Sequence, residues 1–182
     1  MQYEIDKADV LTRIDAEWDR FALENQAPDL TRSSLIGTSL WEHVAGEEAR
    51  QLYEHVFRQV RRQQAPASIP FRCDSPSGRR FLRLQIDPLA DLEIRITSLT
   101  EKIEDRPYVD LLDSTIARSD SIVTICGWCK KILMPDGRWA EVEEAINSLR
   151  LLDAGIPRLS HGICPPCSDD LLGSLDGHSA DD

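Results

Sequence analysis

The chain has 182 residues, of which 41% are hydrophobic and 29% charged, and its net charge is −11. This balance is typical of a globular protein with one ordinary domain, or a small domain with an appendage. Residues 1–103 carry 14 Lys and Arg against 17 Asp and Glu, whereas residues 104–182 carry 7 against 15. Binding to nucleic acid needs a basic patch, so the strongly acidic second half argues against that class of partner.

The N-terminal residues are polar from the start, and the chain contains no run of about 18 apolar residues. We therefore expect no signal peptide, no membrane contact and a cytoplasmic location. The cytoplasm keeps thiols reduced, which favours metal binding or redox chemistry over structural disulfides for the five cysteines.

The first third of the chain predicts a β-hairpin followed by a short helix. Residues 3–14 hold two short runs of alternating apolar and polar residues around a polar tetrapeptide. Trp18, Phe21 and Ala22 then fall at helical spacing, and the polar segment 24–34 with its proline predicts a loop.

A longer helix and three strands are expected next. Acidic residues after Gly46 open the helix, and its apolar stripe covers residues 52–60. Alternating patterns then predict three strands separated by turn residues, at Ile69–Cys73, Arg80–Ile86 and Leu92–Thr97. In the third strand, Leu92 is expected to face inward together with Ile94 and Ile96.

This order of elements resembles a PAS domain, in an α+β fold with a five-stranded antiparallel sheet and helices on one face. The segments DAEWDRFA at 15–22, GTSLW at 37–41 and FRCDSP at 71–76 carry the resemblance. It covers residues 1–103 and implies a sensory or interaction module of a bacterial signalling protein that often dimerises. It does not imply a particular ligand, since such domains bind haem, flavin, small metabolites or nothing.

Several side chains in this half are candidate ligand contacts, each with a simpler alternative. His43 and His55 are either haem ligands or, with better support, surface or capping residues. Cys73 is either a flavin or redox cysteine or a half-buried small residue beside a turn. Four aromatic residues line a cavity or simply fill the core: Trp18, Phe21, Trp41 and Phe57. Four arginines form a basic face of the sheet or an ordinary solvent face: Arg79, Arg80, Arg83 and Arg95.

Residues 104–120 predict a short amphipathic connector helix, because Val109, Leu112 and Ile116 are helically spaced after Pro107. Such a helix either transmits a conformational change or simply docks on its neighbours.

Two C-x-x-C pairs, Cys126 with Cys129 and Cys164 with Cys167, are separated by 34 residues. Four thiolates fill a tetrahedral structural zinc site, so we expect one zinc ion per chain at these cysteines. Between the pairs, the turn Pro135-Asp136-Gly137 predicts a hairpin, and apolar spacing over 139–149 predicts a helix. A second helix is expected to begin at the Cys164 pair.

The runs CGWCKKI at 126–132, GRW at 137–139 and SHGICPPC at 160–167 resemble a cysteine-rich, treble-clef-like tail attached to bacterial PAS sensors and histidine kinases. This resemblance implies a zinc module over residues 121–173, followed by a disordered acidic tail at 174–182. No kinase or output domain accompanies it in this sequence.

Three interpretations of the cysteine site remain open at this stage: a structural zinc ion, a thiol redox switch and an iron–sulfur cluster. Covalent haem is excluded, because no histidine directly follows either pair. His161 is a fourth ligand, a hydrogen-bond donor to a sulfur or a turn cap.

The sequence contains no phosphate-binding glycine loop, no G-x-S-x-G and no H-E-x-x-H, so an enzyme is not expected. We expect a non-enzymatic sensory or adaptor protein with a protein partner or a homodimer, or alternatively a redox sensor whose detector is the zinc site.

Overall fold

The computed structural model describes residues 1–24, 27–44 and 46–176 and forms two compact units. The first unit comprises the described residues of Met1–Ile69, Leu84–Leu99 and 173–176. The second comprises Pro70–Arg83 and Thr100–Leu172. The units therefore interleave along the chain instead of meeting at residue 103.

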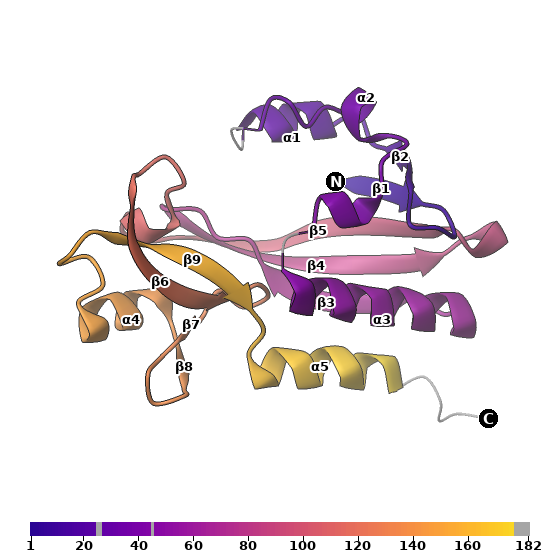
Figure 1. Ribbon diagram of the computed structural model, residues 1–182. Helices are drawn as coiled ribbons and strands as arrows, with labels where there is room; N and C mark the ends of the chain where they lie inside the picture. The colour runs from indigo at the N-terminus through magenta and orange to yellow at the C-terminus, as the bar shows by residue number, and fades with distance from the viewer. Residues whose placement is uncertain (25–26, 45, 177–182) are drawn as a thin grey trace. The chain divides into compact units, whose positions relative to one another are not determined.

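A five-stranded sheet has the strand order β2-β1-β5-β4-β3 (Figure 1). Strand β1 pairs antiparallel with both β2 and β5, which places Tyr3 opposite Ile14 on one side and Ile96 on the other. The predicted α+β class and the five-stranded antiparallel sheet are confirmed. The strands are β1 Gln2–Ile5, β2 Leu11–Ile14, β3 Ala67–Arg72, β4 Gly78–Pro88 and β5 Ile94–Asp105.

Helix α3, Glu47–Gln63, supplies the main apolar face of the first unit. Its buried side chains Val56, Phe57 and Val60 join Ile5, Ile86, Ile94 and Ile96 of the sheet in one core. Each such side chain contributes about 1.5–3 kcal/mol when it leaves water, so this stripe holds the helix on the strands. The helix ends where Gln64 adopts a left-handed conformation and its N–H caps Val60.

The remaining helices of this unit are short: α1 Trp18–Glu24, α2 Arg32–Leu35 and the 3-10 turn η1 Leu40–Glu42. Helix α2 lies where a loop was expected, and Thr31 caps it by accepting a hydrogen bond from the N–H of Ser34. The prediction that Leu92 faces inward is wrong, because its side chain is 49% exposed. It belongs to the 3-10 turn η2, Ala90–Leu92, and its φ of 64° takes it out of the pleat before β5 begins at Ile94.

The second unit is built around a four-stranded sheet of order β8-β7-β6-β9. Strand β9, Ile156–Gly162, was not predicted and runs parallel to β6, Arg118–Cys126, so that Cys126 lies opposite Gly162. The predicted hairpin is present as β7, Ile132–Leu133, and β8, Trp139–Ala140. Helix α4, Val142–Leu149, starts three residues later than expected because Trp139 belongs to β8, and α5 covers Pro165–Asp176.

The connector helix expected over residues 104–120 does not form. Strand β5 continues to Asp105, a 3-10 turn η3 spans Asp110–Leu112, and β6 begins at Arg118. The main-chain N–H groups of Arg106 and Val109 bond to the carbonyls of Ser77 and Pro76, so the segment follows the neighbouring turn instead of coiling. The tail expected at 174–182 begins as part of α5, and residues 177–182 lie outside the described residues.

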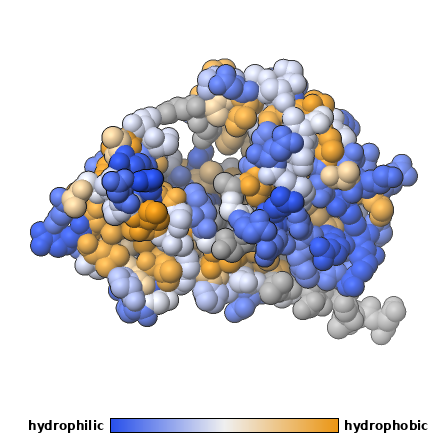
Figure 2. Space-filling model, in the orientation of Figure 1, coloured by the Kyte–Doolittle hydropathy of each residue, from blue (hydrophilic) through white to orange (hydrophobic). Residues whose placement is uncertain are grey.

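The core of the second unit combines this segment with the β-sheet and α4. Leu111, Ile125, Ile132 and Val142 are at most 2% exposed. Figure 2 shows hydrophobic side chains gathered over the region of α4, β6 and β9.

Candidate metal centre

The four predicted cysteines converge at one point of the second unit. The sulfur atoms of Cys126, Cys129, Cys164 and Cys167 all lie within 4.8 Å of one another, and those of Cys129 and Cys164 are 3.6 Å apart. A zinc ion with four Zn–S bonds of about 2.3 Å holds its sulfurs about 3.8 Å apart. The spacing therefore suits a tetrahedral ion at the centre, whereas a disulfide needs sulfurs about 2.05 Å apart.

The first pair lies on a tight turn at the end of β6. The N–H of Cys126 bonds to the carbonyl of Lys131 at 2.7 Å, and Lys130 closes the turn with a φ of 62°. The N–H of Gly127 bonds to the carbonyl of Gly162 at 2.9 Å, so the end of β9 is fixed against this turn. The parallel pairing of β9 with β6 therefore brings the second cysteine pair to the first.

The second pair lies at the start of α5, with Cys164 just before the helix and Cys167 in its first turn. Two main-chain N–H groups point to the Cys126 sulfur, from Cys129 at 3.5 Å and from Cys164 at 3.4 Å. Such donors stabilise a thiolate. The Cys164 bond also links the two halves of the site directly.

The thiols of the site share protons unequally. The pKa of Cys126 lies far below its ordinary value, chiefly because the thiols of Cys129 and Cys167 and two N–H groups donate to its sulfur. Donating to Cys126 in turn raises the pKa of Cys129 to about 12, and it also raises that of Cys167. These hydrogen bonds favour the thiolate form of Cys126, and a metal ion bound by all four sulfurs would displace the remaining thiol protons. Metal affinity is therefore coupled to pH.

Lys130 supplies positive charge beside the site. Its ammonium group donates to the carbonyl of Gly127 at 2.6 Å, and burial lowers its pKa while neighbouring Cys73, Asp74 and Cys126 oppose that shift. A zinc ion with four thiolates has a net charge of −2, which a nearby cation partly offsets. Soft sulfur donors, tetrahedral spacing, N–H support and a compensating cation together fit zinc.

His161 lies on β9 opposite Ile125 and is exposed. Among the described residues, the group of converging ligand atoms contains the four cysteines and does not include this histidine. Its pKa is lowered by partial desolvation of the ring and by the positive charge of Lys130.

The sequence did not reveal a buried ionic cluster that connects this site to the sheet strands of the second unit. The side chains of Asp74 and Arg106 are 1% and 2% exposed, and they form an ion pair at 3.0 Å. Arg72 binds Asp74 through two hydrogen bonds and Glu141, just before α4, at 2.9 Å. Arg106 also pairs with Glu143 of α4 at 3.2 Å. These five residues form the ionic cluster.

The four arginines of the expected basic face are not free charges. Arg79 pairs with Glu143, Arg83 with Glu101 and Arg95 with Glu4, and Arg80 donates to the carbonyl of Cys73. Acidic partners thus neutralise three of these arginines and the fourth is held by the main chain. A basic face on the sheet is therefore not supported.

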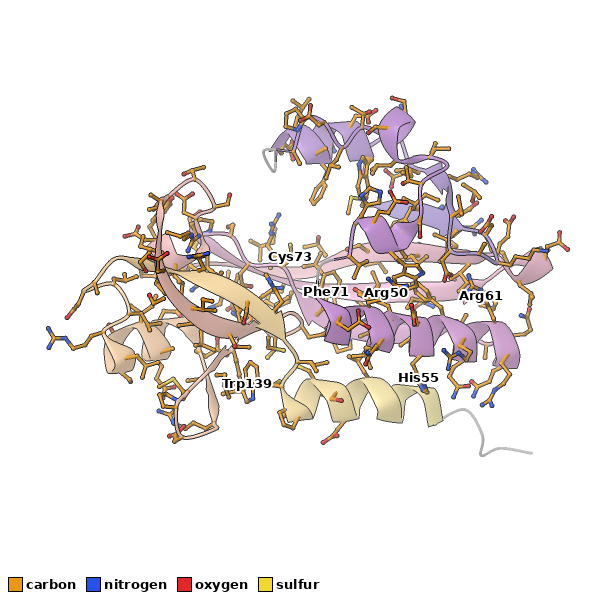
Figure 3. All side chains as sticks on the ribbon, viewed as in Figure 1. Arg50, His55, Arg61, Phe71, Cys73 and Trp139 are labelled. Carbon is orange, nitrogen blue, oxygen red and sulfur yellow. The ribbon has the colours of Figure 1, made fainter. Side chains whose placement is uncertain are left out.

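The other candidate side chains have ordinary structural surroundings. His43 is exposed and shares a hydrogen bond with Thr38 at 2.8 Å, while His55 lies half-buried on α3 (Figure 3). The sulfur of Cys73 lies 3.6 Å from a side-chain nitrogen of Arg80. Phe57 is buried against Trp41, with ring centroids 5.8 Å apart.

No protein-family model, no curated protein and no solved structure matches this chain. Among the described residues, no helix is both long and apolar enough to cross a membrane. The converging cysteines and the sheet topology are consequently the observations on which a function is proposed.

Proposed function

We propose that this chain is a non-catalytic signalling or adaptor protein of the cytoplasm, with a PAS-like sensory domain and a zinc module that presents a surface to a protein partner. One observation carries the proposal: four cysteine sulfurs converge within 4.8 Å in the same compact unit as the ends of β3, β4 and β5. Four cysteines close a zinc site and leave no position for a substrate, which favours a structural role.

The PAS-like assignment is supported by the order of elements, β1 and β2, short helices, the long α3 and then β3 to β5. The sheet order β2-β1-β5-β4-β3 places the first and last strands of the domain side by side at its centre. Dimerisation and a protein partner are part of the same proposal.

The two proposed modules share strands of the chain. Strands β3, β4 and β5 each contribute residues to both units, and within the second unit the ionic cluster links the end of β3 and the residue after β5 to Glu141 and to Glu143 of α4. We propose that these shared strands, and not a connector helix, link sensing to the cysteine site.

Light scattering of the zinc-loaded protein and incubation with radiolabelled ATP test this function. We expect a dimer and no incorporation of label into the pure protein. Autophosphorylation or sustained ATP turnover would show that the chain is an enzyme and would overturn the proposal.

A second candidate function is a thiol redox sensor in which the zinc site is the detector. Cys129 and Cys167 are only partly buried, and the sulfurs of Cys129 and Cys164 lie 3.6 Å apart, which places a disulfide within reach once zinc is lost. In this case mild peroxide oxidises two thiolates to a disulfide, is itself reduced to water, and releases zinc, and thiol reductant reverses the change. A purely structural site keeps its zinc under the same treatment.

A further inference from the structure

A partly enclosed apolar cavity of about 230 Å³ lies in the first unit, apart from the cysteine site. Its lining residues come from β1 and β2 and from α1, α2 and η1, and Figure 1 shows α1 and α2 beside β1 and β2. Its apolar walls include Leu11 and Ile14 of β2, Leu35 of α2 and Leu40 of η1. Among the described residues, the lining includes His43 but no Asp, Glu, Lys or Arg, so the cavity suits an uncharged molecule.

Two aromatic rings shape the cavity. Tyr3 and Trp18 both line it and meet edge to face, with centroids 6.4 Å apart and planes at 81°. The indole N–H of Trp18 bonds to the carbonyl of Leu30 at 2.8 Å, which fixes the orientation of this ring and of the chain beside it. A guest ring placed here gains further edge-to-face contacts, each worth more than its buried area alone.

The cavity also offers a polar contact. Tyr3 carries a hydroxyl group whose pKa is raised by burial and, to a lesser extent, by Tyr53, so at neutral pH it stays protonated and can donate or accept a hydrogen bond. Such a group fixes the orientation of a guest that carries one hydrogen-bonding atom.

The volume sets the size of the guest. An apolar cavity of about 150 Å³ accommodates benzene, so about 230 Å³ corresponds to a ring system roughly one and a half times larger. We propose that this cavity binds a small uncharged aromatic molecule about the size of indole, with one hydrogen-bonding atom directed to Tyr3. Its biological role, as the signal of the sensory domain, rests on the proposed function.

Titration of the zinc-loaded, nitrogen-15-labelled chain with unlabelled indole tests this inference by NMR. We expect the indole N–H signal of Trp18, assigned with Trp18→Phe, to shift saturably with a Kd below about 1 mM. The signals of Trp128 and Trp139, which lie in the second unit, report whether the fold and the zinc site are intact.

Three variants locate the binding. Ile14→Phe fills the cavity and is expected to weaken indole binding at least about tenfold, whereas Ile36→Phe, at a position that is 47% exposed and outside the lining, keeps it unchanged. Tyr3→Phe retains the ring and removes the hydroxyl, so a loss of about fivefold is expected.

If the chemical shift of the Trp18 indole signal does not change at about 5 mM indole, the inference is overturned. Equal affinity of Ile14→Phe and the unaltered protein for indole would also overturn it. Either result leaves zinc content and oligomeric state unaffected, so failure of this inference is distinguishable from failure of the proposed function.

Discussion

The main-chain N–H of Arg72 donates a 2.7 Å hydrogen bond to the carbonyl oxygen of Trp128, which lies between the first two cysteines. This bond joins the last residue of β3 to the turn that holds Cys126 and Cys129. The side chain of Arg72 continues the connection through Asp74 and Glu141. The metal centre and the end of β3 are thus parts of one folded unit, and altering either is expected to affect the other.

Removal of one ligand is expected to unfold the second unit. Cys164→Ser leaves three sulfurs, and binding of structural zinc supplies roughly 10–16 kcal/mol of folding free energy, most of which this variant loses. Zinc content and thermal unfolding followed by circular dichroism measure the effect. Cys73→Ser is the matched control, since Cys73 lies outside the ligand group and this variant should keep both zinc and stability. Equal zinc content in the two variants would contradict the assignment of ligands.

The ionic cluster is expected to contribute more to the free energy of unfolding than the surface ion pairs do. Asp74→Asn removes the buried carboxylate that both Arg72 and Arg106 bind and leaves Arg106, whose side chain is 2% exposed, with Glu143 alone. Breaking a buried pair costs about 3–5 kcal/mol. Arg83→Met breaks a pair whose members are 40% and 42% exposed, and a change within about 1 kcal/mol is expected. Urea unfolding of both variants gives the comparison. Similar midpoints for the two would show that the cluster does not hold the unit together.

Lys130 is expected to protect the zinc thiolates. Lys130→Met removes the cation beside a site of net charge −2, so the sulfurs become more nucleophilic and peroxide should release zinc about tenfold faster. A metal-sensitive dye follows the release. Lys131→Met, one residue further along the chain, serves as the control and should behave like the unaltered protein. If both variants release zinc at the same rate, charge compensation by Lys130 has no part in the stability of the site.

Asp19 gives the first unit a predictable dependence on pH. Its carboxylate accepts hydrogen bonds from the N–H of Arg32 at 2.8 Å and from the Arg32 side chain at 2.9 Å, and these bonds hold its pKa below the ordinary value. Because the pKa is lower in the folded than in the unfolded protein, ionised Asp19 stabilises the folded state at pH values above the unfolded pKa of about 4. This stabilisation is lost as the pH falls through the pKa of the folded protein.

The difference in urea midpoint between the unaltered protein and Asp19→Asn should therefore be constant from about pH 6 to 8 and shrink below about pH 4. Comparing the two proteins at each pH cancels any loss of zinc, which is common to both. A difference that persists unchanged in acid would show that ionisation of Asp19 contributes nothing.

The elements that the sequence predicted well are those whose signal is local. The alternation in β1 and β2 and the apolar stripe of α3 depend on neighbouring residues alone, and each was found close to its expected bounds. The cysteine pairs are equally local, since a C-x-x-C turn presents two sulfurs whatever surrounds it. That the two pairs come together could be predicted because four cysteine thiolates commonly bind one structural zinc ion.

The parts that the sequence did not reveal depend on distant partners. Strand β9 contains Pro157, and it forms by parallel pairing with β6, about 38 residues earlier in the chain. The helical spacing after Pro107 was misleading, because Val109 and Leu111 are buried by the core of the second unit and not by a helix face. The hydrogen bond between Arg72 and Glu141 joins residues 69 positions apart in the sequence, so no local sequence pattern predicts it.

The most direct test of the metal centre is elemental analysis of protein purified without oxygen, combined with alkylation of its thiols before and after chelation. The predicted result is one zinc ion per chain, with Cys73 reacting at once and Cys126, Cys129, Cys164 and Cys167 protected until a chelator removes the metal. Protein without bound metal, or coloured protein containing iron, would contradict the zinc assignment and leave redox chemistry as the explanation for the cluster.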